Sequence, residues 1–166
     1  MAHVGEDFAD VVFAGRDIDG QQFVRCDFTD ADLRGVHTSG CRFVECDFTR
    51  ADLGESRHTT TALHTCTFDH SMLADAVFDG CSLVGSMFVE CRMRPLTIRD
   101  TDLTLASLTG ADLRTLELVG LRFRETNLGG ANLTGADLRD ADLAGARLLG
   151  AKLVDADLRG AIVDAD

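Results

Sequence analysis

The chain has 166 residues, of which 45% are hydrophobic, and a net charge of −12 from 28 acidic and 16 basic residues. Its length is typical of one domain, and the excess of acids argues against nucleic acid as a ligand and favours a basic partner. Because neither a membrane-spanning apolar run nor a signal peptide is recognisable, we expect a cytoplasmic protein, away from membranes, whose six cysteines are reduced.

We call every fifth position from Phe8 to Val163 a centre, and 30 of these 32 positions carry a large apolar residue. All ten Phe are centres, all six Cys lie two residues before one, and 13 of the 16 Gly lie two residues after one, with Gly5 in the same register ahead of the first centre. After the first coil, the residue two before a centre is usually small, with Leu96, Leu116 and Leu121 the largest. A period of five fits neither a helix nor a strand, so the chain must turn at regular intervals.

The run Ala-Asn-Leu-Thr-Gly-Ala-Asp-Leu-Arg-Asp-Ala-Asp-Leu at 131–143 resembles the repeat of pentapeptide-repeat proteins. The resemblance implies an all-β fold, a right-handed quadrilateral parallel β-helix of about eight coils with four pentapeptides in each. At the usual spacing between strands, the rod would be roughly 38 Å long. Residues 1–5 would form an N-terminal lead-in, and 6–165 a single repeat domain without insertion loops. With 20 residues per coil, Phe8, Phe28, Phe48, Phe68 and Phe88 would stack.

The first coil carries Glu6, Arg16 and Gln21 where later coils carry small residues, which is typical of a polar solenoid cap. Thr38 and His58 are the two polar centres, and they fall on adjacent levels of one column. We interpret them as a structural, hydrogen-bonded buried pair, with a pH switch as the alternative.

The sequence indicates neither a catalytic site nor a metal site. Cys26, Cys46 and Cys66 would stack in successive coils, and such a row is typical of free core thiols rather than a tetrahedral metal site or disulfides. The histidines have no fixed spacing to a partner, and no nucleophile or phosphate-loop motif occurs. We therefore expect a protein that is not an enzyme and has no catalytic residues, metal or cofactor.

Pro95 is the only proline, and it lies at a turn position. Proline cannot donate a hydrogen bond to a neighbouring coil. We expect a structural role here, a local turn distortion with a slight kink, and a cis peptide bond is the alternative.

The outward residues concentrate negative charge on two opposite faces. The face of the Phe column has a net charge of −5 and the opposite face a net charge of −4, so both are candidate partner-binding surfaces. The first face carries Asp7, Asp10, Asp27, Asp30, Asp47, Asp69 and Glu90, and the second carries Asp79, Asp100, Glu117, Asp137, Asp140 and Asp157, together with Asp17 and Asp19. Solvation of an ordinary β-helix is the alternative explanation for these acids.

The segments 86–97, Ser-Met-Phe-Val-Glu-Cys-Arg-Met-Arg-Pro-Leu-Thr, and 102–106, Asp-Leu-Thr-Leu-Ala, are similar to the mycobacterial quinolone-resistance pentapeptide-repeat family. That resemblance implies a cytoplasmic homodimer that mimics DNA and binds DNA gyrase, inhibiting it or protecting it from fluoroquinolones. The alternative is a structural or interaction protein with another basic partner.

The family has a C-terminal helical tail that pairs the protomers, and this tail is apparently absent here. We expect dimerisation through the last coil instead, while a truncated sequence or a monomer are the alternatives. The residues proposed for this contact are Leu153, Leu158, Ile162 and Val163.

Overall fold

The computed structural model describes residues 1–164, in which every regular element is a short β-strand and no α-helix occurs. It follows that these residues contain no helix able to cross a membrane. The strands are β1 (Ala2–Val4), β2 (Asp17–Asp19), β3 (Gln22–Val24), β4 (His37–Ser39), β5 (Arg42–Val44), β6 (Arg57–Thr59), β7 (Ala62–His64), β8 (Thr67–Asp69), β9 (Ala76–Asp79), β10 (Met87–Val89) and β11 (Leu96–Arg99).

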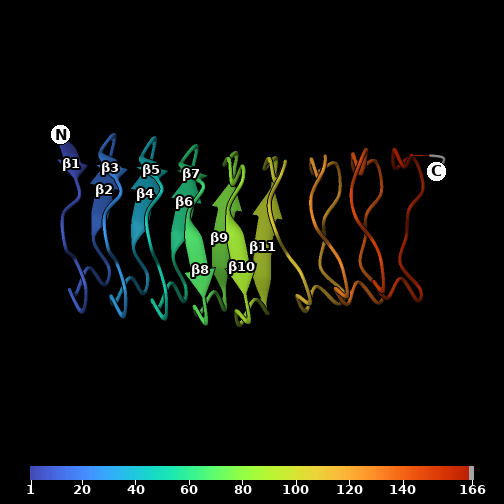
Figure 1. Ribbon diagram of the computed structural model, residues 1–166, viewed down its shortest axis with the longest axis horizontal. Coiled ribbons are helices and arrows are strands. Elements are labelled where there is room, and N and C mark those ends of the chain that lie inside the picture. The colour runs from blue at the N-terminus through green and yellow to red at the C-terminus, as the bar shows by residue number, and fades with distance from the viewer. Residues whose placement is uncertain (165–166) are drawn as a thin grey trace.

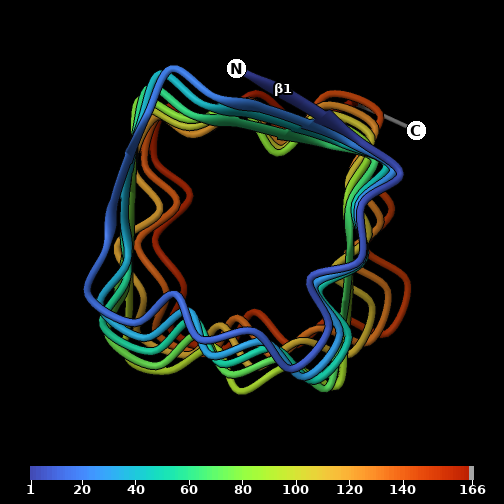
Figure 2. The same ribbon diagram turned by 90° about the vertical axis from the view of Figure 1, so that its left-hand side faces the viewer.

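The strands pair in parallel with a constant separation of 20 residues, from Ala2↔Gln22 in β1 and β3 to Leu96↔Ala76 in β11 and β9. Three sheets result, ordered β1-β3-β5-β7, β10-β8 and β11-β9-β6-β4-β2. The chain thus winds into a rod (Figure 1) whose cross-section is four-sided (Figure 2). The expected parallel β-solenoid is confirmed.

The named strands end at Arg99 and amount to about five turns, fewer than the eight coils expected. Beyond Arg99 the coils continue as isolated parallel bridges, the last of which joins Asp142 to Ile162. At the other end, residues 1–5, expected as a lead-in, contain β1, which already pairs with β3. Ala165, the expected last residue of the repeat domain, lies outside the described residues.

The turns explain why the repeat length is five. Every fifth residue from Gly5 to Gly160 has a positive φ, with Pro95 as the single exception. Fourteen of these residues are glycines, which adopt that conformation without steric cost. The proline ring holds φ near −65°, so Pro95 cannot form the turn that the other positions form. The Arg94–Pro95 peptide bond is cis.

The centres fill the interior with stacked side chains. The predicted ladder from Phe8 to Phe88 is confirmed, with ring centroids between 4.7 and 5.1 Å apart. In a second column, Phe23 stacks on Phe43 at 4.7 Å and is covered on its other side by His3 at 4.8 Å. Offset stacking adds to the hydrophobic gain from burying the rings.

The two polar centres form one buried network. Thr38 Oγ1 lies 2.8 Å from His58 Nδ1 and 3.0 Å from Thr61 Oγ1, and Ser56 Oγ lies 2.9 Å from His58 Nε2. The imidazole also stacks on Phe78 at 4.8 Å. Both ring nitrogens therefore have partners, as a buried polar group requires. Because burial penalises the charged imidazolium, the pKa of His58 falls to about 4.

Candidate interaction surfaces

The acidic residues that precede the centres have a structural task that sequence reasoning missed. Asp27 Oδ1 accepts a hydrogen bond from the amide of Thr29 at 2.8 Å, and Asp47 Oδ1 accepts one from Thr49 at 2.9 Å. Asn127 does the same with its amide oxygen towards Gly129. These bonds stabilise the turns locally. They use one oxygen of each carboxylate and do not require its charge.

We call the outward residues of the pentapeptides centred on Phe8, Phe28, Phe48, Phe68 and Phe88 the Phe-ladder face. The structure brings Asp7, Asp27 and Asp47 into one row, because Asp27 bridges to both of the others in parallel. In residues 1–164 no side chain forms an ion pair with these three carboxylates. The row therefore presents three uncompensated negative charges at the coil spacing, about 4.8 Å apart.

The other acids of the Phe-ladder face are partly neutralised. Arg50 donates two hydrogen bonds to Asp30, at 2.8 and 2.6 Å, and lowers the pKa of that carboxyl. His70 lies between Asp69 and Glu90, at 2.5 and 2.8 Å. Its hydrogen bond to Asp69 raises the pKa of His70. The strongest negative field on this face thus lies over the first three coils.

The opposite face, formed by the outward residues of the pentapeptides centred on Ile18 to Leu158, is a mixed surface. Arg139 donates to both oxygens of Asp137, at 2.8 and 2.6 Å, and lies 3.9 Å from Asp157. Arg159 binds Asp157 in the same way, and its hydrogen bonds lower the pKa of Asp157 to about 2. Within the described part of the chain, Asp79, Asp100, Glu117 and Asp140 have no ion-pair partner. Both faces therefore combine paired and unpaired acids, which the formal charges −5 and −4 did not reveal.

The residues expected at a dimer contact all lie in the last described coil. Ile162 and Val163 are 56% and 51% exposed, whereas Leu153 and Leu158 are half-buried against the core. Leu149 and Val154 are exposed beside them.

The thiols have the surroundings of core side chains. Cys26, Cys46 and Cys66 are free and buried, and burial raises the pKa of the Cys66 thiol well above its usual value. Among the described residues there is no group of three His, Cys, Asp or Glu side chains that could hold a metal ion.

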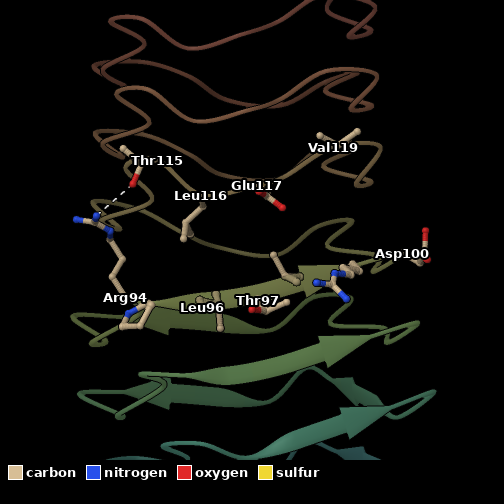
Figure 3. Close-up of a pocket in the computed structure, with 11 residues that line it drawn as sticks. Arg94, Leu96, Thr97, Asp100, Thr115, Leu116, Glu117 and Val119 are labelled. Carbon is tan, nitrogen blue, oxygen red and sulfur yellow. Dashed lines mark hydrogen bonds between the residues drawn. The ribbon is translucent and has the colours of Figure 1, made fainter.

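A cleft beside Pro95 is the feature that sequence reasoning missed altogether (Figure 3). It has a volume of about 820 Å³ and separates β11 from the same face of the next coil, at Leu116–Val119. Arg94 closes one end, where its guanidinium donates to Thr115 Oγ1 at 3.2 Å. The signal available in the sequence was the combination of Pro95 with the oversized Leu96 and Leu116.

The coil, its five-residue turns and its filled interior define a β-solenoid of pentapeptide repeats. Consistent with that class, eight copies of the family "Pentapeptide repeats" match residues 22–57 and 122–160. Residues 22–57 and 122–160 are thus pentapeptide repeats, and the chain resembles the proteins built from them.

The known proteins that it resembles include a second pentapeptide repeat protein and a fluoroquinolone resistance protein. Over 66 residues it is 52% identical to pentapeptide repeat protein MfpA of Mycobacterium tuberculosis, a match covering 40% of this chain and 36% of MfpA. QnrB1, a plasmid-mediated fluoroquinolone resistance protein, has a trypsin-treated form with a TM-score of 0.83 at 26% identity, over 99% of this chain and 92% of the other.

A third likeness concerns the fold alone. HetL, a pentapeptide repeat protein from the cyanobacterium Nostoc involved in regulating heterocyst differentiation, has a TM-score of 0.73 at 21% identity. The match covers 98% of this chain and 87% of HetL. The same rod thus occurs in proteins of different roles, and function must be argued from surfaces.

Proposed function

We propose that this protein mimics duplex DNA and binds DNA gyrase, inhibiting it, protecting it from fluoroquinolones, or both. The observation that carries the proposal is the row Asp7, Asp27 and Asp47, whose carboxylates stand along the rod with no cation beside them. The likeness to MfpA and to QnrB1 supports quinolone resistance as the setting. A cytoplasmic location accompanies this proposal, since gyrase acts there.

The electrostatics of a rod suit this role. Duplex DNA carries one negative charge per about 1.7 Å, or on the order of 20 over 38 Å, and proteins bind it largely through those charges. This rod carries 28 acidic residues. A basic, DNA-binding surface of gyrase would therefore contact carboxylates at regular intervals along this rod instead of phosphates. The protein therefore acts by binding, and its filled interior leaves no space for a catalytic pocket.

The test separates the charge of these carboxylates from the hydrogen bonds that they accept in the turns. Changing Asp27 and Asp47 to Asn retains the oxygen that accepts the turn amide and removes two charges. The matched control changes Asp32 and Asp52 to Asn on the adjacent face, where both acids contact Arg34 and accept equivalent turn bonds.

Inhibition of gyrase supercoiling should weaken about tenfold in the first variant, because each lost contact contributes roughly 0.5–1 kcal/mol at an exposed site. The control variant should inhibit like the unchanged protein. A protein that leaves supercoiling unaltered at micromolar concentration, with and without a quinolone, would refute the proposal.

A second candidate is a structural or interaction protein with another basic partner. The paired acids of the opposite face favour this function, because a surface of mixed charge is suited to protein contacts more than to imitation of phosphates. A pulldown from the host separates the two candidates. The pulldown is repeated with a variant of the protein in which Asp100, Glu117, Asp137 and Asp140 are changed to Asn. This variant should no longer capture a basic partner of the opposite face but should still capture gyrase.

We also propose that two copies pair through the last coil, at Ile162 and Val163 with Leu153 and Leu158 behind them. The exposure of the first two side chains supports this proposal.

A further inference from the structure

Among residues 1–164 the ladder of hydrogen bonds between coils is interrupted after the coil that contains β11, on the face of β11 and on the preceding face, where neither Met93 N to Asp112 O nor Asp112 N to Cys91 O forms. On the face of β11, coils further along are joined by Leu118 N to Asp137 O at 2.8 Å, Asp137 N to Leu116 O at 2.9 Å, and Gly120 N to Arg139 O at 2.9 Å. The equivalent bonds one coil earlier would join Ile98 to Glu117, Glu117 to Leu96, and Asp100 to Val119. None of these three forms in the described structure, and no bridge links Thr97 to Glu117.

Two features of the sequence hold these coils apart. Pro95 has no amide hydrogen and cannot reach the positive φ of the other turns, so one bond and one turn are lost. Leu96 and Leu116 occupy positions that are small in most coils, and both line the cleft. Leu116 and Glu117 point from their coil toward β11 (Figure 3).

The cleft therefore has two parallel β-edges facing each other. One edge offers the amides of Ile98 and Asp100 and the carbonyl of Leu96, and the other offers the amide and carbonyl of Glu117 and the carbonyl of Val119. Peptides in an extended conformation bind to exposed strand edges through such groups. We propose that this cleft binds an extended peptide segment of about four residues, which enters parallel to β11 as an inserted strand and hydrogen-bonds to both edges.

The charges at the rim specify the side chains of the occupant. Arg94 is engaged by Asp112 and Thr115. Arg99 and Glu117 have no ion-pair partner among residues 1–164. In an inserted parallel strand, one residue would face outward beside Thr97 and Glu117, and the residue two further on would face outward beside Arg99 and Val119.

Opposite charges on neighbouring strands attract, and like charges repel. The cleft thus selects a basic residue, then an apolar residue directed inward between Ile98 and Leu118, then an acidic residue. The partner is a protein segment with the order basic–apolar–acidic in extended conformation.

The direct test measures binding of a fluorescein-labelled peptide Gly-Lys-Leu-Glu-Gly by anisotropy. The reversed peptide Gly-Glu-Leu-Lys-Gly has the same composition and should bind about tenfold more weakly, because both outward pairs become repulsive. A third peptide, methylated on the leucine nitrogen, loses the amide that would donate to Glu117 O and should not bind measurably.

Two protein variants complete the test. Glu117→Lys should reduce or invert the preference between the two charged peptides. Combining Pro95→Gly with Leu96→Ala and Leu116→Ala should allow the coils to close and abolish binding, while circular dichroism verifies that the solenoid is retained.

Equal affinity for the two charged peptides, or undiminished binding of the methylated peptide, would overturn the proposal. So would the absence of binding of all three peptides to the unchanged protein at millimolar concentration. The outcome is separate from gyrase inhibition, since Asp27 and Asp47 lie on a different face.

Discussion

His58 shows how one residue in a repetitive core can determine a solution property. It occupies a position that is apolar in nearly every other pentapeptide, and it is accepted because Thr38 and Ser56 satisfy both ring nitrogens. The cost of burying its charged form is not relieved by an acid, since no carboxylate contacts the ring in the described structure. The neighbouring His37 also disfavours protonation. The side chain is therefore neutral at physiological pH.

This environment predicts a loss of stability in acid. The folded pKa of about 4 lies below the ordinary value of 6.5, so the unfolded chain binds a proton first as the pH falls. The contribution of neutral His58 to the free energy of unfolding is complete above pH 6.5. It decreases by about 3 kcal/mol as the pH falls to 4.

Urea unfolding at pH 7 and pH 4.5 measures this change, and His58→Gln is the control because glutamine bonds without titrating. The unchanged protein should lose more stability between pH 7 and pH 4.5 than the His58→Gln variant does. If both proteins lose the same amount, a group other than His58 is responsible.

At the scale of elements, β11 differs from β4, β6 and β9 of the same sheet because it is paired on one side only, although a further coil follows it. The sheet runs without a break from β2 through β4, β6 and β9 to β11, where the pairing stops. It resumes one coil later, between Glu117 and Asp137. Proline at a turn was expected to distort the rod slightly. The structure shows a larger effect, an open cleft of about 820 Å³, because Leu96 and Leu116 act together with Pro95.

Amide hydrogen exchange should reveal this interruption. The amides of Ile98 and Glu117 have no acceptor and should exchange at least about a hundredfold faster than those of Leu118 and Asp137, which are bonded. Each pair lies on the same face, so the comparison controls for position. Equal protection of all four amides would mean that the coils pair in solution.

At the scale of the whole molecule, stability in a solenoid is the sum of contacts between neighbouring coils, so the ends matter most. The N-terminal end is covered by the stacking of His3 on Phe23 and by His3 contacts with Glu6 and Gln21, at 3.0 and 3.2 Å. The other end of the described chain exposes Ile162 and Val163. This asymmetry is the physical basis of the proposed pairing of two copies.

Light scattering after size exclusion tests that pairing. The unchanged protein should elute as a dimer, and Ile162→Asp combined with Val163→Asp should elute as a monomer, because two carboxylates cannot be buried without partners. Val12→Asp, at a side chain of the first coil that is 59% exposed, is the matched control and should remain a dimer. A monomeric unchanged protein would exclude this contact.

The sequence by itself determined that the chain turns every five residues, and its resemblance to pentapeptide-repeat proteins supplied the 20-residue coil in which Phe28, Phe48 and Phe68 stack. It also located Thr38 and His58 on adjacent levels and placed most acids on two faces. Tertiary structure alone decided which acids are free, since Arg139 and Arg159 reach their partners through side-chain geometry that formal charge does not contain. It alone opened the cleft at Pro95, because whether neighbouring coils close depends on the combined volume and bonding of residues 20 positions apart.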